Sequence, residues 1–498
     1  MNNLLKIVLV LLLAGVLRAG AAGSLPRSTP ETQGVSSTSL LDLVGALDQI
    51  DAMHGLVIVR HGQVIAEGWW APCDAAHQHV LYSLSKSFTS SAVGFAVAEG
   101  RLNIDDPVLK FFPEDAPAEP SDNLKAMRVR DLLMMSAGQQ DEPPRAPDEV
   151  SAKSFLAQPV PHFPGTHFMY NTPATFMLSA IVQKVAGQTV LEYLRPRLFE
   201  PLDIERPVWD TNFQGISLGG YGLRVHTEDV AKLGQLYLQR GNWQGRQILP
   251  EDWVALATAK EASNGSNPDS DWNQGYGFQF WRCRHHAFRG DGAFGQYCLV
   301  MPDQDTVVAI NSGVRNMQAV LNIIWDKLLP NLQAQALPPN PKAVQMLGDK
   351  LAHLEVRPQA GAATSSITAR VINRRFVFPA NDEKIEGIEL TDLDAGKAMT
   401  LSLRMAGKDW EIPCGYREWR KSRAPLFAGK LAQFPDEPMA GTFAWPGDDT
   451  CAFKLCAFET PYHKMLTLKF DGDRVTLDSE LNVSFERAKQ PSLTGQTP

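Results

Sequence analysis

The sequence predicts an α/β protein of the α+β type, in which an antiparallel sheet is flanked by helices, a helical subdomain is inserted, and a C-terminal all-β domain follows. Three observations support this fold class. Strand-like segments occur near residue 55 and again at 276–313, on either side of a mainly helical stretch. A Pro-rich break, "QAQALPPNPKA", comes next. Beyond it the chain alternates β-branched and turn residues, as in "MLTLKFDGDRVTLDS".

The local patterns predict each element in turn. "GLVIVRHGQVIAEGWW" predicts two strands joined at His61-Gly62, a hairpin signal. Helical periodicity predicts helices over 83–99, 129–136, 173–187 and 227–239. The returning strands are expected in "GYGFQFWRC", "HAFRG", "FGQYCLVMP" and "TVVAINSG", followed by a helix in "NMQAVLNIIWDKLLPNL". The predicted domains are a signal peptide (1–22), a first domain (30–335, helical at about 81–260), a linker (336–364) and a β-rich domain (365–490).

The N-terminal residues, "MNNLLKIVLVLLLAGVLRAGAAGS", have the features of an export signal. Lys6 supplies the basic start of such a signal. Residues 7–17 form an apolar segment that is too short to span a bilayer comfortably, and "AGA" at 19–21 offers small residues for cleavage. We therefore expect a periplasmic or secreted protein with no stable membrane span after cleavage. The alternative is a retained membrane anchor.

Composition narrows the classes of partner. The net charge of −8 and the pI near 5.8 argue against a nucleic-acid partner, which would need a basic face. No His-Glu-x-x-His or paired Cys-x-x-Cys spacing occurs, so we predict no metal and no cofactor, and interpret His285–His286 as a solvated strand end. Of the six cysteines, Cys283 and Cys298 are the candidate bridge because they fall on neighbouring predicted strands, and the others are expected to be buried free thiols.

"SLSK" at the start of the helix predicted over 83–99 places Ser83 and Lys86 on one face, one turn apart. The N-terminus of a helix has free N–H groups and a positive dipole end, which can hold a developing oxyanion. A serine hydroxyl needs an adjacent base, and a lysine is such a base if burial lowers its pKa. The same letters also fit an ordinary helix start with an exposed lysine. The buried stripe of this helix is expected to be Leu84, Phe88, Ala92 and Phe95.

Several ordered segments carry a resemblance to a known family. "LYSLSKSFTSSAVGFAVAEGRLNIDDPV", "VRDLLMMSAG", "PGTHFMYNTPATFMLSAIV" and "GGYGLRVHTEDVAKLGQLYLQRGNWQGRQILPEDWV" together resemble the serine β-lactamase and penicillin-recognising superfamily. The class C-like branch, with its esterase and 6-aminohexanoate-dimer hydrolase relatives, is the most similar, over roughly residues 30–330. The resemblance implies that Ser83 is the nucleophile of the family's Ser-x-x-Lys motif. It also implies that Tyr170 works with Lys86 to deprotonate the serine and then protonate the leaving group, although Tyr170 also fits a core aromatic.

The second motif departs from the family pattern. The family's Tyr-x-Asn would put asparagine at 172, whereas this chain has Thr172, which can still donate a hydrogen bond to a substrate carbonyl. Asn171 stands one place early and is expected to point elsewhere. For the relay through Tyr170, we expect the neighbouring ammonium to depress the pKa of the phenol.

The third family motif, Lys-Thr-Gly or His-x-Gly on an edge strand, aligns with Gly290-Asp291-Gly292, to within one residue. The resemblance implies that substrate contacts Thr172, Asp291 and Gly292, and that the N–H groups of Ser83 and Ala293 form the oxyanion hole.

The cation of that motif is missing. Gly290 cannot bind a carboxylate, Asp291 would repel one, and strand alternation turns Arg289 to the opposite face from Gly290. We therefore expect neutral esters, or amides bearing an amine, to be preferred over β-lactams.

"GISLG" at 215–219 matches the nucleophile elbow of another hydrolase fold, but no apolar strand precedes it and no helix follows until about Thr227, so Ser217 is interpreted as a loop serine. The main prediction is an exported, cofactor-independent serine hydrolase that cleaves a small-molecule ester or amide through an acyl-enzyme on Ser83. The enzyme alternatives are a β-lactamase or a D-Ala-D-Ala type peptidase. The alternative of another class is a non-catalytic ligand-binding or sensor protein on the same scaffold. The C-terminal domain either covers the cleft or serves assembly.

Overall fold

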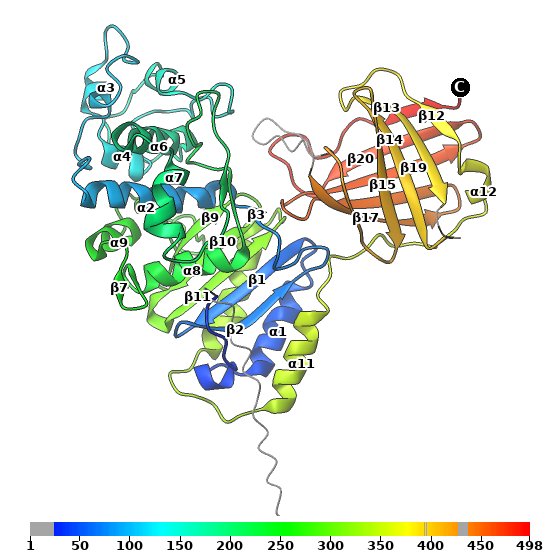
Figure 1. The fold of residues 1–498 in the computed structure, drawn as a ribbon, viewed down its shortest axis with the longest axis horizontal. Helices are drawn as coiled ribbons and strands as arrows, with labels where there is room; N and C mark the ends of the chain where they lie inside the picture. The colour runs from blue at the N-terminus through cyan, green and yellow to red at the C-terminus, as the bar shows by residue number, and fades with distance from the viewer. Residues whose placement is uncertain (1–23, 393, 395, 427–436) are drawn as a thin grey trace, which may run out of the picture.

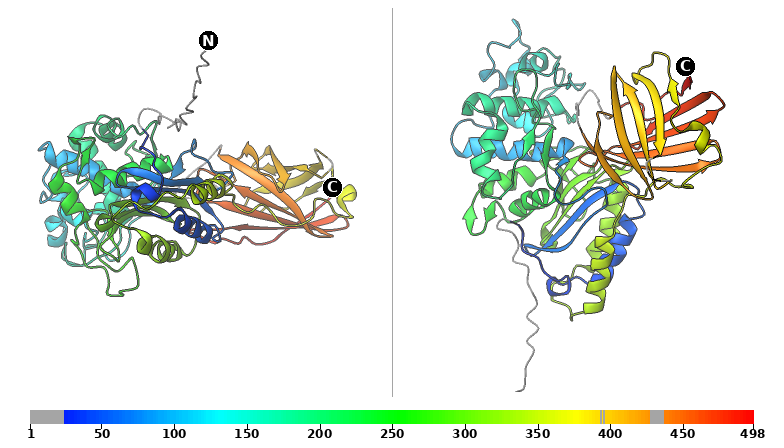
Figure 2. Two further views of the ribbon diagram at one scale, coloured as in Figure 1. Left: turned by 90° about the horizontal axis from the view of Figure 1, so that it is seen from below. Right: turned by 45° about the vertical axis from the view of Figure 1, so that its right-hand side comes forward.

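The computed structural model describes residues 24–392, 394, 396–426 and 437–498. A layered first domain carries a helical lobe, and a C-terminal barrel stands beside them (Figure 1). Two further views show that the barrel extends from one end of the first domain (Figure 2). The predicted signal peptide, residues 1–22, lies outside the described residues. Among the described helices, none combines the length and the apolar character that crossing a membrane requires.

A six-stranded antiparallel sheet forms the centre of the first domain, in the order β2-β1-β11-β10-β9-β8. Its strands are β1 (Met53–Arg60), β2 (Gln63–Trp69), β8 (Trp281–Arg282), β9 (Phe288–Gly292), β10 (Gln296–Met301) and β11 (Thr306–Ser312). The turn between β1 and β2 is His61-Gly62, where both residues have positive φ, as the hairpin signal predicts. Because β11 pairs with β1, the sheet combines segments that are distant in the sequence.

Helices cover both faces of this sheet, because successive side chains of a strand point to opposite sides (Figure 1). On β1, Val57 and Val59 belong to the apolar cluster that includes α2 and α8. Leu56 and Ile58 belong to the second cluster, which includes α1, α10 and α11. These helices are α1 (Ser37–Leu47), α2 (Ser85–Ala98), α8 (Thr227–Leu238), α10 (Met317–Ile323) and α11 (Pro341–Ala352).

The helical lobe surrounds α2, which is buried on every side from Ser85 to Ala96 rather than along one stripe. Two of its hydroxyl groups tolerate this burial because they are hydrogen-bonded: Ser87 Oγ donates to the Gln279 carbonyl at 3.0 Å, and Thr89 Oγ1 to the Gly219 carbonyl at 2.9 Å. The other helices of the lobe are α3 (Asp122–Ala126), α4 (Val129–Leu133), α5 (Ala152–Leu156), α6 (Thr172–Ala186), α7 (Val190–Leu194) and α9 (Glu251–Thr258). Short strands accompany them: β3 (His79–Val80), β4 (Val208–Trp209), β5 (Leu223–Val225), β6 (Asn242–Trp243) and β7 (Arg246–Gln247).

The C-terminal domain is a ten-stranded barrel around its own apolar core, which includes Leu401, Phe443 and Leu468. The parallel pairing of β15 with β17 closes the sheet, so the all-β prediction is confirmed. The strands are β12 (Arg375–Val377), β13 (Ile385–Asp392), β14 (Ala398–Met405), β15 (Lys408–Tyr416), β16 (Arg420–Arg423), β17 (Pro438–Gly447), β18 (Thr450–Cys456), β19 (His463–Asp471), β20 (Arg474–Leu481) and β21 (Leu493–Gln496).

Three expectations need correction. Residues 341–352, within the predicted linker, form α11, which buries Leu347 in the cluster of α1. The strand expected across "GYGFQFWRC" is reduced to the two residues of β8. Cys283 and Cys298 are free thiols, because Cys298 lies in the cluster on the α2 side of the sheet and Cys283 in the cluster on the α1 side.

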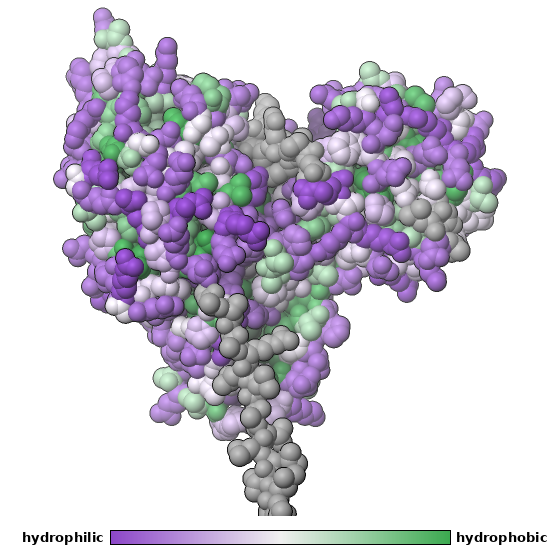
Figure 3. Space-filling model, viewed as in Figure 1, coloured by the Kyte–Doolittle hydropathy of each residue, from purple (hydrophilic) through white to green (hydrophobic). Residues whose placement is uncertain are grey.

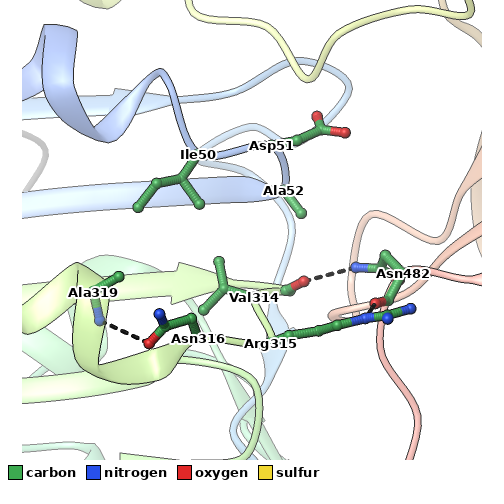
Figure 4. A pocket seen from close by; sticks show the side chains of 9 residues that line it. Ile50, Asp51, Ala52, Val314, Arg315, Asn316, Ala319 and Asn482 are labelled. Carbon is green, nitrogen blue, oxygen red and sulfur yellow. Dashed lines mark hydrogen bonds between the residues drawn. The ribbon is translucent and has the colours of Figure 1, made fainter.

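The barrel docks on the first domain through polar contacts. Asn482 Nδ2 donates to the Gly313 carbonyl at 2.8 Å, and Lys454 forms an ion pair with Asp51 at 2.8 Å. A pocket at this junction includes Val314, Arg315 and Asn482 in its lining (Figure 4). On the face seen in Figure 3, hydrophilic residues predominate on both parts and hydrophobic ones are scattered among them.

Candidate active site

Ser83 lies in a strained turn between β3 and α2. It is the middle residue of a 3₁₀ turn, η2 (Tyr82–Leu84), and α2 itself begins at Ser85, slightly later than predicted. The preceding residue, Tyr82, has φ 45°, in the left-handed region that non-glycine residues seldom adopt. Such strain clusters at active sites, where the surrounding structure holds a reactive side chain in place.

Lys86 is buried within hydrogen-bonding distance of Ser83. Its Nζ donates to Ser83 Oγ at 3.0 Å, to the Gly220 carbonyl at 2.8 Å and to Thr172 Oγ1 at 3.4 Å. The side chain is 1% exposed. Burial lowers the pKa of Lys86 to about 7, although the nearby carboxylate of Glu142 opposes this shift. Near neutral pH the amine is therefore partly unprotonated and can accept the Ser83 proton.

Tyr170 lies beside the same pair. Lys86 Nζ is 5.0 Å from the centroid of its ring, and the Ser83 hydroxyl is close enough to the phenol to lower the pKa of Tyr170, against the larger effect of burial. The ring stacks on Trp281, with the centroids 5.3 Å apart and the planes at 23°. Burial, and then the negative charge of Asp291, raise the pKa of Tyr170 well above 10. The expectation that the ammonium depresses the phenol pKa is therefore wrong: the lysine pKa is the one that falls, and Tyr170 stays a phenol.

The side chains of Thr172 and Asn171 have different partners although the two residues are adjacent. Thr172 is buried, with its hydroxyl towards Lys86. Asn171 caps α6: its Oδ1 accepts a hydrogen bond from the backbone of the first turn, and its Nδ2 donates to Gln139. Asn171 therefore points away from the Lys86 amine, and threonine occupies the position where the family pattern has asparagine.

Two glycines let β9 approach the Ser83 turn. A Cβ at Gly292 would lie 2.0 Å from the Leu81 carbonyl oxygen, and one at Gly290 would lie 2.4 Å from Leu84 Cδ1. Any larger residue would push the strand away from η2. The glycines therefore bring the backbone that leads to Ala293 against the segment that holds Ser83.

Arg289 and Asp291 share the face of β9 opposite Gly290, as strand alternation predicts. The two side chains form a buried ion pair, with Arg289 Nη2 2.7 Å from Asp291 Oδ2. Desolvation raises the pKa of Asp291, and the Arg289 guanidinium opposes this shift. Asp291 is thus an ion-paired and nearly inaccessible carboxylate, which corrects the expectation that its charge would repel an anionic substrate.

The barrel reaches the same region. Tyr462 of the barrel has its hydroxyl 2.6 Å from that of Tyr82, next to Ser83. Phe485, which is 44% exposed, packs on Phe294 with ring centroids 4.7 Å apart, and the Arg145 guanidinium lies 5.5 Å from the Phe485 ring centroid. These contacts place residues of the barrel beside the Ser83 turn.

Five residues near Ser83 were not predicted from the sequence: Glu142, Gly220, Trp281, Tyr462 and Phe485. Gly220 is within a quoted segment, but a backbone carbonyl leaves no signal of its role in the sequence. Tyr462 is 380 residues from its partner, so no spacing pattern links them.

Ser217 is placed as a loop serine. It is buried, pairs across an isolated bridge with Thr211, and has no helix after it until α8 begins at Thr227. The elbow geometry that the motif requires is absent at this described position.

The beta-lactamase family model matches residues 42–321, more than half of the chain. A 6-aminohexanoate-dimer hydrolase from Paenarthrobacter ureafaciens is 26% identical over 298 residues, which cover 55% of this chain and 75% of that protein. A beta-lactamase from Escherichia coli (strain K12) is 28% identical over 184 residues, or 32% of this chain and 47% of that protein. A solved structure described as a candidate 6-aminohexanoate-dimer hydrolase from Bacillus anthracis has a TM-score of 0.52 at 19% identity, over 63% of this chain and 89% of that chain, and shares the fold.

Proposed function

Because the chain belongs to the beta-lactamase family, we propose that it is a serine hydrolase that forms an acyl-enzyme on Ser83. Its similarity to a 6-aminohexanoate-dimer hydrolase supports this proposal. One observation carries the proposal: a buried amine, Lys86 Nζ, lies 3.0 Å from Ser83 Oγ and has a pKa near 7. A lysine with that pKa is a competent base at neutral pH, whereas an exposed lysine is not. The non-catalytic alternative gives no reason to bury an amine beside a strained serine.

In the first half-reaction, neutral Lys86 takes the Ser83 proton while Oγ attacks the substrate carbonyl. The N–H groups of Ser83 and Ala293 stabilise the oxyanion, an arrangement that the close approach of β9 to η2 supports. The proton then passes from Lys86, through the Tyr170 hydroxyl, to the departing oxygen or nitrogen. In the second half-reaction a water molecule loses a proton to the same groups and attacks the acyl-enzyme, which releases the acid and restores Ser83.

The substrate class that fits this site is a neutral ester or amide. On β9, Gly290 has no side chain to bind a carboxylate, and the Arg289 charge is committed to Asp291. The aromatic rings of Phe294 and Phe485 offer an apolar surface near the Ser83 turn. The space beside Gly292 is filled by the Leu81 carbonyl, so this glycine serves the approach of β9 to the Ser83 turn, and the Thr172 hydroxyl is the group we propose for contact with a substrate carbonyl. Export through the N-terminal signal remains part of the proposal, and fractionation of cells that express the full chain tests it.

Hydrolysis of p-nitrophenyl esters, a linear amide dimer, a D-Ala-D-Ala peptide and a chromogenic cephalosporin tests the proposal. We expect a short-chain ester to give the highest kcat/KM, and Ser83→Ala to lower kcat by about 10³-fold or more. Ser217→Ala is the matched control and should stay within about twofold of wild type. Full ester hydrolysis by Ser83→Ala would refute the nucleophile assignment, and faster cleavage of the cephalosporin would refute the substrate class.

A further inference from the structure

Five histidine and cysteine side chains are buried together where the barrel meets the first domain, and the proposed mechanism uses none of them. This His–Cys cluster consists of His54, Cys73, His79, Cys456 and His463, each no more than 7% exposed. The first three come from β1, the segment after β2, and β3. The last two are directly paired across β18 and β19 of the barrel. So many buried polar groups in one place call for a physical explanation.

The hydrogen bonds fix the tautomers of two histidines. His79 Nδ1 lies 3.0 Å from the Val80 carbonyl, which can only accept, so this nitrogen carries the proton. The bare Nε2 of His79 accepts from His54 Nδ1 at 3.1 Å, which leaves the lone pair on His54 Nε2, 3.1 Å from His463 Nε2. A histidine that binds a metal is usually oriented in this way, by a second group that holds its other N–H.

The two thiols complete the arrangement. One ligand atom each from His54, Cys73 and Cys456 lie within 4.8 Å of one another. Cys456 stands directly opposite His463 in the β18–β19 pair, so this thiol and this imidazole are neighbours in the barrel. A thiolate and a neutral imidazole are the forms that bind metals.

We propose that the cluster binds one divalent transition metal of the Zn²⁺ class, with His54, Cys73 and Cys456 as ligands, His463 as the neighbouring imidazole, and His79 as the residue that positions His54. Sulfur and imidazole ligands suit Zn²⁺, with bonds of about 2.3 and 2.0 Å in a tetrahedral site. Binding releases the thiol protons to solvent, and two thiolates balance the two positive charges, so the buried site has no net charge. Each of these residues is no more than 7% exposed, so the metal would be shut off from substrate, and we infer a structural role for the site.

The consequence of this site is that the metal joins two domains. His54 and Cys73 belong to the first domain, whereas Cys456 and His463 belong to the barrel. The hydrogen bond between Tyr82 and Tyr462 spans the same junction, immediately before Ser83. Bound metal would therefore hold the barrel, and with it Phe485, against the catalytic domain.

Metal analysis and Co²⁺ titration of the purified full chain test this proposal. We expect about one zinc per chain, and a Co²⁺ spectrum with a thiolate charge-transfer band and the visible bands of a tetrahedral site. Removal of the metal with a chelator should lower the Tm by about 5–10 °C, and added Zn²⁺ should restore it. Cys73→Ser and Cys456→Ser should lose the metal, whereas Cys451→Ser, a buried thiol of the barrel core, should keep it.

Two results would overturn the proposal. One is the absence of zinc and of any thiolate–cobalt band in wild-type protein with reduced thiols, a result that does not depend on whether the variants fold. The other is a Cys73–Cys456 disulfide, in which the thiols have passed two electrons and two protons to an oxidant, detected as a chain about 2 Da lighter and as a cross-linked peptide. Neither result bears on Ser83, because hydrolysis is assayed separately.

Discussion

Replacing Lys86 by methionine tests whether the buried amine has the depressed pKa that the mechanism needs. In the folded chain the pKa of Lys86 is about 7, against an ordinary value of 10.5. Between these two pH values the unfolded chain holds a proton on this amine that the folded chain has lost. The unfolding free energy of wild type should therefore rise with pH in this window, by about 1.4 kcal/mol per pH unit from this group alone.

The difference in unfolding free energy between Lys86→Met and wild type isolates the pH-dependent contribution of Lys86, because the two proteins share all other titrating groups. We expect methionine to stabilise the fold most at pH 7 and below, and this advantage to shrink by about 4 kcal/mol between pH 7 and pH 10. The side chain is 1% exposed, so solvent screens the effect little. Ester hydrolysis should be lost in the same variant.

Chemical denaturation followed by tryptophan fluorescence, at half-unit steps from pH 6 to pH 10, measures this difference. Lys153→Met, at an exposed lysine of α5, is the matched control and should give a difference that does not change with pH. A flat difference for Lys86→Met would show that the folded chain keeps an ordinary lysine, and the reasoning about its role as a base would fail.

Three further predictions follow from the site. The kcat/KM of wild type should rise with pH through a midpoint near 7, because Lys86 loses its proton there. It should stay high up to at least about pH 9, because the pKa of Tyr170 is raised. A profile centred near pH 10 would contradict this assignment. Tyr170→Phe should lower kcat by about 10²–10⁴-fold for a linear amide and less for a nitrophenyl ester, whose leaving group needs no proton, as steady-state kinetics will show. Phe485→Ala should raise KM for aromatic esters about three- to tenfold with kcat unchanged, and an unaltered KM would separate the barrel from substrate binding.

The sequence could predict the part of the site that is formed by residues close together in the chain. Ser83 and Lys86 are three residues apart, so a helical turn alone brings them together. The contacts of Lys86 with Gly220 and Thr172 span 134 and 86 residues and depend on how the lobe folds around α2. The pKa of Tyr170 was predicted in the wrong direction because burial, which the sequence does not display, dominates its environment.

The start of α11 has a signal in the sequence. Helix α11 lies in a Pro-rich segment, but Asn340 caps it and Pro341 occupies its first position, where proline is favoured. In contrast, the ligands of the proposed metal site are spread from residue 54 to residue 456, with none of the spacings typical of metal motifs. Only the docking of the barrel brings them together.

The most direct test of the central claim is to treat the protein with a fluorophosphonate probe and to locate the label by peptide mass spectrometry. A serine activated by a neutral lysine should form a stable adduct on Ser83 at pH 8, and Lys86→Met should react at least about 100-fold more slowly. Labelling of Ser217, or of Ser83 at an equal rate without Lys86, would contradict the account.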